Sequence, residues 1–447
     1  MTDDLIIVIP GITGSALERD GRPVWDLSVA AVVRGVARTQ QVLDSMALPP
    51  IGDGPADERH ALTPVGLIDG WHVWPGFWAG PGYGGLLRHL RAAVPDTAQI
   101  LPFPYDWRLS NAHTAALLKA FAERAVATRR RQTGTDVGVV FVCHSMGGLV
   151  ARYYLEVLGG RDIATKLITL GTPYSGSVKA VRAVVGSLAP AAPGLSGKVA
   201  AVARTFPSVA ELLPAYRCVQ LGQREEPVLL HGADVPDLPS GLAAVGREFH
   251  DTLSAAVAAN GAAPYATYAF GGKDQPTDQS MTVNAGRVTY SRRQRGSDYG
   301  GDGTVPYFSA LPPEWDRSGP GMFRAARHAP LAKDGVLLDA LTDKINDLDL
   351  GEVMRPPAEM ALDLPDAAAP GRPFEITVSA ARTSLIIQAD VNGIDGKPYD
   401  QAIPIPPVGD GTYRATLNLP PGTWHIAVRT PAETPVATID DLISVQD

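Results

Sequence analysis

One serine of the chain stands where a catalytic nucleophile is expected. Ser145 lies in VVFVCHSMGGLVARYYL, where a buried apolar run gives way to a helical pattern. A turn from strand to helix presents a serine hydroxyl at the carboxyl end of the strand. The residues two before and two after such a serine must be small, and here they are Cys143 and Gly147, so the first departs from the usual glycine. The segment predicts a nucleophile; the alternative is a serine that only caps a helix.

A serine nucleophile needs a general base to remove its proton. Four histidines follow Ser145 along the chain, namely His231, His250, His328 and His425. His328 stands in the loop FRAARHAP, before a helix predicted over Leu331–Ile345. His425 falls in an alternating strand pattern near the C-terminus, and the other two precede the last predicted strands of the sheet. We therefore predict that His328 is the base.

The base needs an acid to orient it, and two aspartates compete for this role. Asp274 follows a predicted strand in GGKDQP, and Asp302 lies in GGDGTVP, 26 residues before His328. Both satisfy the order of serine, acid and histidine along the chain, and the short separation of Asp302 from His328, which leaves room for one crossover, favours Asp302. Asp274 stays as the alternative. A Ca²⁺ site at Asp298 and Asp302 is disfavoured, because their spacing lacks the EF-hand pattern.

The chemistry also needs two donors for the oxyanion that forms on the attacked carbonyl. The backbone N–H of Met146 directly follows the nucleophile at the start of a helix. A second donor is expected from the glycine-containing loop Pro10–Ser15, and we assign it to the N–H of Ile12. The alternative for this loop is an ordinary strand-to-loop turn.

The elements that must position these residues follow an alternating order of strands and helices. Near-continuous apolar runs, typical of strands buried on both faces of a parallel sheet, occur at Leu5–Ile9, Asp136–Cys143, Lys166–Leu170 and Tyr265–Phe270. Helical spacing is found over Asn111–Gln132, between Ser110 and Gly134, and over Leu149–Leu158. This order predicts a doubly wound α/β sheet.

Beyond residue 351 the pattern changes. Met354–Pro370 is rich in proline and alanine and is interpreted as a linker. Short alternating runs follow at Phe374–Val378, Leu385–Val391, Tyr413–Leu419 and Trp424–Val428. We predict a catalytic domain over residues 1–355, with insertions at about 18–85 and 175–262, and a small all-β sandwich domain over 366–447.

Six short motifs occur in the order found in one family of lipid-acyl enzymes. They are VIPGITGSAL (8–17), VWPGF (73–77), PYDWR (104–108), HSMGGLVARYYL (144–155), LGTPYSGS (170–177) and GDGTVP (301–306), followed by His328. The chain thus resembles the lecithin:cholesterol acyltransferase family, which also includes lysosomal phospholipase A2 and the phospholipid:diacylglycerol acyltransferases. The resemblance implies an α/β-hydrolase fold with lid insertions and the aspartate of GDGTVP as the acid.

The two insertions are expected to form lids that shape the substrate site. The second contains KVAAVARTFPSVAELLPAY, an apolar composition that suits a lipid acyl chain. The first carries an aromatic cluster, which either packs or lines an acyl pocket and touches lipid: Trp71, Trp74, Phe77 and Trp78. The cysteine pair that staples the lid of secreted family members has no counterpart, since no cysteine precedes Cys143.

Composition and net charge restrict the expected partners and the expected cellular location. A net charge of −8 and a pI of about 5.6 disfavour nucleic-acid partners. Two cysteines in 447 residues favour a reducing compartment, and no signal peptide or membrane span is recognised, so a cytoplasmic location is expected. No cofactor and no metal are predicted.

Taken with the resemblance, these residues predict a serine-dependent acyl-ester hydrolase or acyltransferase. Its expected substrate is a lipid ester, as for a phospholipase or lipase, and the lid is expected to contact lipid or a membrane surface. A carboxylesterase or lactonase acting on soluble esters would use the same residues. A hydrolase fold that only binds is the third hypothesis. The partner of the β domain stays open between carbohydrate, protein and none.

Overall fold

The structure is a computed structural model of the 447-residue chain. It describes residues 4–25, 39–51, 60–69, 72–74, 78–80, 82–188, 193–222, 226–315, 319–347, 360–380, 385–394, 396–431 and 436–446.

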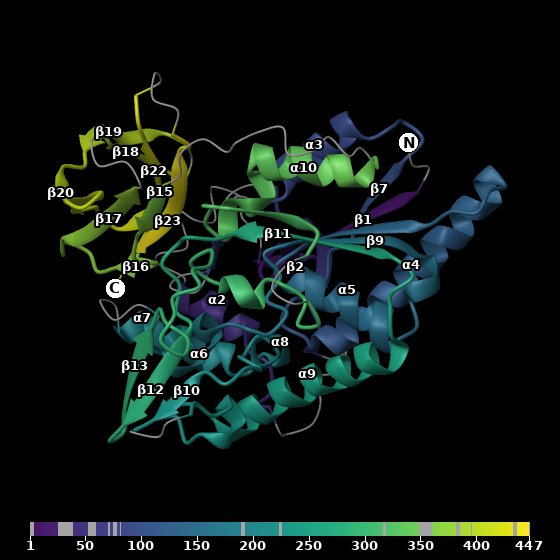
Figure 1. The fold of residues 1–447 in the computed structure, drawn as a ribbon, viewed down its shortest axis with the longest axis horizontal. Helices are drawn as coiled ribbons and strands as arrows, with labels where there is room; N and C mark the ends of the chain where they lie inside the picture. The colour runs from purple at the N-terminus through teal and green to yellow at the C-terminus, as the bar shows by residue number, and fades with distance from the viewer. Residues whose placement is uncertain are drawn as a thin grey trace.

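A six-stranded parallel sheet in the order β14-β11-β9-β8-β1-β7 forms the centre of the larger part of the molecule (Figure 1). Its strands are β1 (Leu5–Ile9), β7 (Gln99–Pro102), β8 (Val139–His144), β9 (Ala164–Leu170), β11 (Ala266–Gly272) and β14 (Gly321–Arg324). The four strands predicted from apolar runs are confirmed with small shifts in their bounds.

The apolar runs are continuous because both faces of the sheet are covered. Along β1, Leu5, Ile7 and Ile9 belong to one core cluster, whereas Ile6 and Val8 belong to another on the opposite face. All five residues are fully buried. Because neither face of this strand meets solvent, its sequence shows no alternation of apolar and polar residues.

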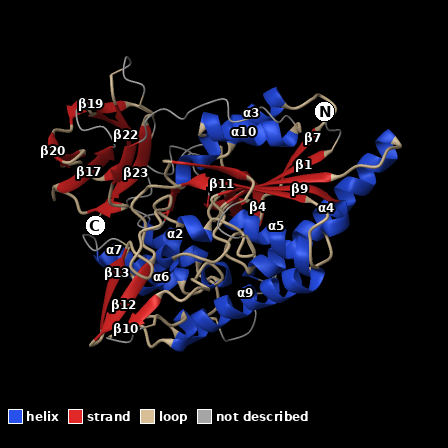
Figure 2. Ribbon diagram, viewed as in Figure 1, coloured by secondary structure: helices blue, strands red, loops and turns tan. Residues whose placement is uncertain are grey.

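Helices lie on both sides of this sheet, as Figure 2 shows in blue. One side carries α4 (Asn111–Thr133), α5 (Met146–Val157) and α9 (Ser240–Asn260), and the other carries α3 (Gly84–Ala93) and α10 (Gly335–Ile345). The larger part of the chain therefore has the doubly wound α/β-hydrolase fold that the sequence predicts. Within the described residues, no helix is both long and apolar enough to cross a bilayer.

The bounds of α4 follow from its capping residues. The Ser110 Oγ accepts a hydrogen bond from the Ala112 N–H at 3.1 Å, which satisfies one of the free donors of the first turn. Gly134 ends the helix with a φ of 70°, a left-handed conformation that glycine adopts without strain. Both ends agree with the sequence prediction.

Two segments interrupt the alternation of strands and helices. The first forms β2 (Ser15–Arg19), β3 (Arg22–Trp25), α2 (Thr39–Met46), β4 (Thr63–Leu67), β5 (His72–Trp74) and β6 (Trp78–Gly80). The second contains α6 (Val178–Val185), α7 (Pro193–Ala203), α8 (Pro207–Ala210), β10 (Val219–Leu221) and η3 (Leu230–Gly232) before α9. The first supplies a small sheet, β3-β2-β4, and β10 joins β12 (Ser280–Asn284) and β13 (Arg287–Ser291) in another.

The end of the second segment differs from the expected lid. The sequence predicts an insertion that extends to about residue 262, but α9 lies against α5 as a helix of the main fold. The rings of Tyr153 and Phe249 stack at a centroid distance of 5.3 Å. This apolar face of α9 covers the helix that follows the nucleophile, so α9 is the crossover helix that leads to β11.

Glu211 anchors the second segment to the start of α4. Its carboxylate accepts hydrogen bonds from the Ser110 Oγ and the Asn111 N–H, both at 2.6 Å. Burial raises the pKa of Glu211 to about 7, because the ionised carboxylate loses its hydration. The folded chain therefore binds this proton more tightly than the unfolded chain does.

Glu211 is expected to make the folded state less stable as the pH rises. Between its ordinary pKa of 4.5 and its folded pKa of about 7, the folded state holds more protons, so the free energy of unfolding falls by up to about 3 kcal/mol. Neighbouring His250, whose pKa burial lowers to about 4, contributes the opposite slope between that value and its ordinary pKa. The difference in the free energy of unfolding between wild type and Glu211→Gln isolates the contribution of Glu211. Urea unfolding at mildly acidic and mildly basic pH measures this difference.

The matched control for that experiment is Glu248→Gln on the exposed face of α9. Its difference from wild type gives the effect of removing a carboxylate from the protein surface. A difference between wild type and Glu211→Gln that changes with pH no more than this control does would contradict the prediction.

The C-terminal part consists of two packed sheets, antiparallel except for one parallel pair, around a core of its own at the upper left of Figure 1. One sheet has the order β15-β17-β21-β20 and the other β16-β23-β22-β18-β19. The strands are β15 (Met360–Asp363), β16 (Ala367–Ala368), β17 (Phe374–Ala380), β18 (Gln388–Gly393), β19 (Pro398–Pro404), β20 (Pro407–Gly409), β21 (Thr412–Leu417), β22 (Gly422–Arg429) and β23 (Ile439–Val445). This is the predicted sandwich, which we call the β unit.

The linker predicted over Met354–Pro370 is wrong for its second half. β15 pairs with β17, and β16 pairs with β23, so both belong to the β unit. Leu362 and Leu364 are buried in its core. The strand pattern is hidden because these strands are short and lie among prolines and aspartates. The β unit thus includes Met360, ahead of the predicted start at 366, while the division into two domains remains a prediction.

Candidate active site

The backbone of Ser145 adopts a strained turn between β8 and α5. Its φ and ψ are 52° and −126°, a conformation that non-glycine residues adopt only when their surroundings enforce it. The Ser145 N–H donates to the Leu170 carbonyl, and the Ser145 carbonyl accepts from the Thr172 Oγ1, each at 2.8 Å. Neighbouring β9 and the loop after it therefore hold the serine in this conformation.

A close approach of main-chain atoms explains why position 147 is a glycine. A Cβ added to Gly147 would lie 2.6 Å from the carbonyl oxygens of Ile9 and Pro10. The contact that excludes a side chain thus comes from the end of β1 and not from Cys143. Cys143 itself is fully buried, and burial raises the pKa of its thiol, which stays protonated and unreactive.

The structure brings together the three residues predicted as nucleophile, base and acid. The Ser145 Oγ lies 2.9 Å from the His328 Nε2, and the His328 Nδ1 lies 2.5 Å from the Asp302 Oδ2. Their exposed fractions are 4% for Ser145, 2% for His328 and 1% for Asp302. These three side chains are thus within hydrogen-bond reach in a site largely screened from water. Their catalytic roles stay predictions.

Main-chain contacts fix the two loops that carry Asp302 and His328. The His328 N–H donates to the Asp302 carbonyl at 2.8 Å. The other oxygen of the Asp302 carboxylate accepts from the N–H groups of Thr304 and Val305 at 2.9 and 2.7 Å. With one oxygen held by the backbone, the other is directed at the imidazole.

None of the competing residues lies at this site. Asp274 keeps a side chain that is 64% exposed and lies 4.0 Å from Lys273. Asp298 accepts from Gln279 and from the Gly300 N–H. His250 contacts the Glu211 carbonyl, His425 contacts Asp440, and His231 lies in η3. Within the described residues, no group of three or more side chains could hold a metal ion.

The loop proposed to supply the second oxyanion donor lies directly against Ser145. A Cβ added to Gly11 would be 2.9 Å from the Ser145 Cβ. Ile12 is 2% exposed, and Thr13 has a φ of 64°. Among the described residues, no group accepts a hydrogen bond from the backbone N–H of Ile12 or Met146. Both donors are thus available for a ligand oxygen, and their assignment remains a prediction.

Tyr83 and His144 complete the site, although the sequence analysis did not identify them. The Gly11 N–H donates to the Tyr83 hydroxyl at 2.7 Å, and this hydroxyl lies 2.8 Å from the His144 Nδ1. With the hydroxyl donating to Nδ1, the His144 Nε2–H donates to the His328 carbonyl at 3.3 Å. Burial raises the pKa of Tyr83, so it stays a neutral donor. This chain of hydrogen bonds links the loop after β1 to the residue that carries the base.

Tyr83→Phe is expected to lower kcat by about 10- to 100-fold, because the Gly11 N–H loses its acceptor and the oxyanion loop loses its support. Folding should be weakened by only about 1–3 kcal/mol, the cost of a buried donor without a partner. Ester hydrolysis and thermal unfolding measure the two effects. Tyr290→Phe, which removes a hydroxyl bound to Ser187 far from the site, is the matched control. Equal kcat values for the two variants would contradict this role.

The PYDWR segment serves as a brace. The Asp106 carboxylate pairs with Arg108 at 2.6 Å, and Arg108 also donates to the carbonyls of Met46 and His60. Tyr105 donates to the Pro10 carbonyl at 2.8 Å. These contacts tie the first insertion and the loop after β1 to the sheet.

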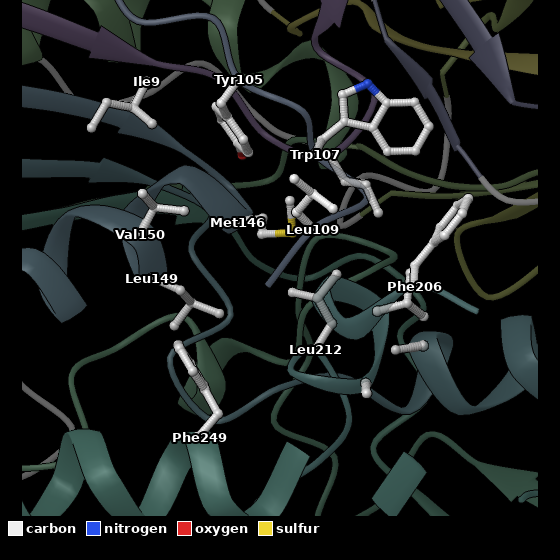
Figure 3. Close-up of a cluster of buried hydrophobic side chains, with 14 of the residues drawn as sticks. Ile9, Tyr105, Trp107, Leu109, Met146, Leu149, Val150, Phe206, Leu212 and Phe249 are labelled. Atoms are coloured by element: carbon white, nitrogen blue, oxygen red, sulfur yellow. The ribbon is translucent and has the colours of Figure 1, made fainter. Parts of the chain in front are cut away.

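The apolar residues expected in the lids are largely used in packing. Figure 3 shows Trp107, Leu109, Met146, Phe206 and Leu212 in one buried cluster. Phe206, in the second insertion, packs edge-on against Trp107 at a ring-centroid distance of 5.9 Å, so apolar residues of this insertion belong to the core of the protein. Of the aromatic cluster, Trp71 and Phe77 lie outside the described residues. Trp74 and Trp78 pair across β5 and β6, and their side chains also lie outside the description.

Comparison with known sequences identifies one family. The family model described as "Lecithin:cholesterol acyltransferase" matches residues 86–233. The resemblance to this family is confirmed there. The matched segment includes PYDWR, HSMGGLVARYYL and LGTPYSGS, whereas Asp302, His328 and the β unit lie beyond it. The lecithin:cholesterol acyltransferase match supports a hydrolase or acyltransferase acting on lipid esters.

Solved structures similar to the chain include two lipid-cleaving enzymes. One is the lipase BlEst2 of Bacillus licheniformis in mature form, with 12% identity, a TM-score of 0.32, and coverage of 76% of this chain and 91% of that one. The other is the phospholipase PlaB of Legionella pneumophila, with 12% identity, a TM-score of 0.31, and coverage of 84% and 91%. A search of curated proteins gave no match. At these identities and TM-scores, both enzymes are distant from this chain.

Proposed function

We propose that the chain is a serine-dependent hydrolase or acyltransferase that forms an acyl-enzyme on Ser145. The observation that supports this most is the continuous contact from the Ser145 Oγ through the His328 imidazole to the Asp302 carboxylate, at 2.9 and 2.5 Å. Such an arrangement activates a hydroxyl that is otherwise a weak nucleophile. The burial of all three side chains strengthens their electrostatic interactions.

In the proposed reaction, the Ser145 Oγ attacks an ester carbonyl carbon while its proton passes to the His328 Nε2. Asp302 holds the Nδ1–H and stabilises the imidazolium that forms. The backbone N–H groups of Met146 and Ile12 bind the oxyanion. When the intermediate collapses, the leaving alcohol takes the proton from Nε2 and the acyl group stays on Ser145. Water or a second alcohol then accepts the acyl group by the reverse steps.

For the substrate we propose a lipid ester, on the strength of the family match over the segment that carries the nucleophile. Contact with lipid through the insertions is part of this proposal. The test is to label the full chain with a fluorophosphonate, and then to measure hydrolysis of p-nitrophenyl esters from acetate to palmitate, with and without phospholipid vesicles. Labelling at Ser145 and a preference for long chains are expected.

Each other result of this experiment rejects one part of the proposal. Absence of labelling would reject the enzyme and favour a fold used only for binding. Labelling with turnover of short esters alone would reject the lipid substrate and favour a carboxylesterase or lactonase. Transfer is separated from hydrolysis by adding a long-chain alcohol and measuring the ester product against the free fatty acid.

A further inference from the structure

The β unit contacts the two loops that carry Asp302 and His328. Arg327 directly precedes His328 and is buried. Its Nη1 donates to the Leu362 carbonyl of β15 at 2.7 Å, and its Nη2 pairs with the Asp441 carboxylate of β23. One side chain thus joins the loop of the base to both sheets of the β unit.

Gln275 makes the corresponding link to the loop of the acid. Its side-chain amide accepts from the Leu362 N–H at 3.0 Å and donates to the Met360 carbonyl at 3.3 Å. Its own N–H donates to the carbonyl of Gly301, the residue before Asp302, at 2.9 Å. Gln275 is 1% exposed. The Gln275 side chain therefore binds backbone groups of β15, while its main chain binds the loop that carries Asp302.

A third link reaches the same acid loop. The Lys179 Nζ pairs with Asp366 of the β unit at 2.8 Å and lies 3.5 Å from the Thr304 Oγ1. The Thr304 N–H is one of the two donors to the Asp302 carboxylate. In addition, the nearest atoms to a Cβ added at Gly303 would belong to the Arg327 guanidinium, at 3.2 Å. The acid loop and the Arg327 side chain are therefore packed together.

These contacts differ from those that would merely join two domains. The Arg292–Asp363 pair also crosses this boundary, but its side chains are 51% and 45% exposed and reach neither loop. The Arg327–Asp441 side chains are 8% and 12% exposed. Exposed ion pairs contribute little to stability, whereas a buried arginine whose planar guanidinium binds two separate acceptors restricts the position of both.

We propose that the β unit is a positioning part of the active site, which holds His328 through Arg327 and Asp302 through Gln275. Arg327, Gln275 and Asp441 are positioning residues, since they act through the triad and need not touch substrate. This inference rests on the proposed function. It assigns the β unit a role in catalysis itself, in place of a separate docking role.

The variant that tests this proposal is Arg327→Met in the full chain. It removes both contacts to the β unit, and the Asp441 left behind can take up a proton because burial raises its pKa. Substituting Asp441 instead would leave the Arg327 guanidinium buried without its carboxylate partner, and a guanidinium cannot lose its proton. We expect kcat to fall by about 10- to 100-fold, with KM changed by no more than about twofold. Labelling of Ser145 by the fluorophosphonate should slow by the same factor.

Two further variants make the test specific. Arg327→Lys keeps the charge but lacks the planar fork that binds two acceptors, so its kcat should fall between those of wild type and Arg327→Met. Arg292→Gln breaks the exposed pair across the same boundary and should behave as wild type. Melting temperatures are measured for every variant, and activities are compared well below the lowest of them.

The outcomes are separable. If folded Arg327→Met labels and turns over at the wild-type rate, the positioning role is overturned while the proposed function stands. If Arg327→Met does not fold, Arg327→Lys decides: a reduced kcat at unchanged KM supports the role, and an unchanged kcat overturns it. If the wild-type chain is not labelled at all, the proposed function fails first and this inference fails with it.

Discussion

Ser145→Ala is expected to lower kcat by a factor on the order of 10⁵ to 10⁶ and to abolish fluorophosphonate labelling, because it removes the hydroxyl that lies 2.9 Å from the His328 Nε2. The loss should not come from unfolding. Alanine keeps the Ser145 backbone bonds to Leu170 and Thr172, which hold the strained turn. Hydrolysis of a chromogenic ester measures the loss of activity, and the melting temperature shows whether the fold is retained. Adding His328→Ala to Ser145→Ala should cost little more, since the two residues act as one unit.

The matched control for this variant is Ser254→Ala, on the exposed face of α9. It should retain full activity and full labelling. A Ser145→Ala protein that still hydrolyses esters at an undiminished rate would reject the acyl-enzyme, whatever the state of the other residues.

Asp302→Asn is expected to lower kcat by about 10⁴-fold while the fold stays intact. An amide at this position donates to the His328 Nδ1, at the place where the carboxylate accepts. The imidazole then carries its proton on Nε2, facing the Ser145 Oγ, and cannot remove a proton from the hydroxyl. The steady-state rates of wild type and variant, and their melting temperatures, measure the effect.

Asp274→Asn is the control that separates the two aspartates weighed from the sequence. Its side chain is exposed, so activity should stay at the wild-type level. The reverse result, with Asp274→Asn inactive and Asp302→Asn active, would show that the acid is Asp274 and that the loop around it moves during turnover.

Most of the central fold could be predicted because burial on both faces leaves a plain sequence signal. β1, β8, β9 and β11 are apolar runs, and α4 carries visible capping residues. β7 and β14 were not predicted, because each has only four residues and lies at an edge of the sheet. At an edge, pairing on one side and less burial on the faces weaken the apolar pattern.

The candidate site was predictable where chemistry restricts residue type and order along the chain. Ser145 follows from its strand–turn–helix context and His328 from its place along the chain. The choice of Asp302 over Asp274 also needs its short separation from His328 and the family resemblance. Tyr83 and His144 could not be found in this way, because 61 residues separate them and only the fold brings them together. The one available signal is that His144 is a polar residue at the end of the buried strand VVFVCH.

The β unit was read correctly as a sandwich, but its connection to the site was not predicted. Arg327 and Asp441 are ordinary surface types in the sequence, and nothing in their neighbourhood marks them as a buried pair. Burial of a charge depends on the docking of two separately formed cores, which no local pattern records.

The backbone bond from the His328 N–H to the Asp302 carbonyl makes inactive variants useful as tools. This bond does not involve the Ser145 side chain, so replacing that serine should leave the two loops in register. A protein with alanine at position 145 can then be soaked or co-crystallised with intact esters. The bound ester would reveal which chain lengths and headgroups the site accepts.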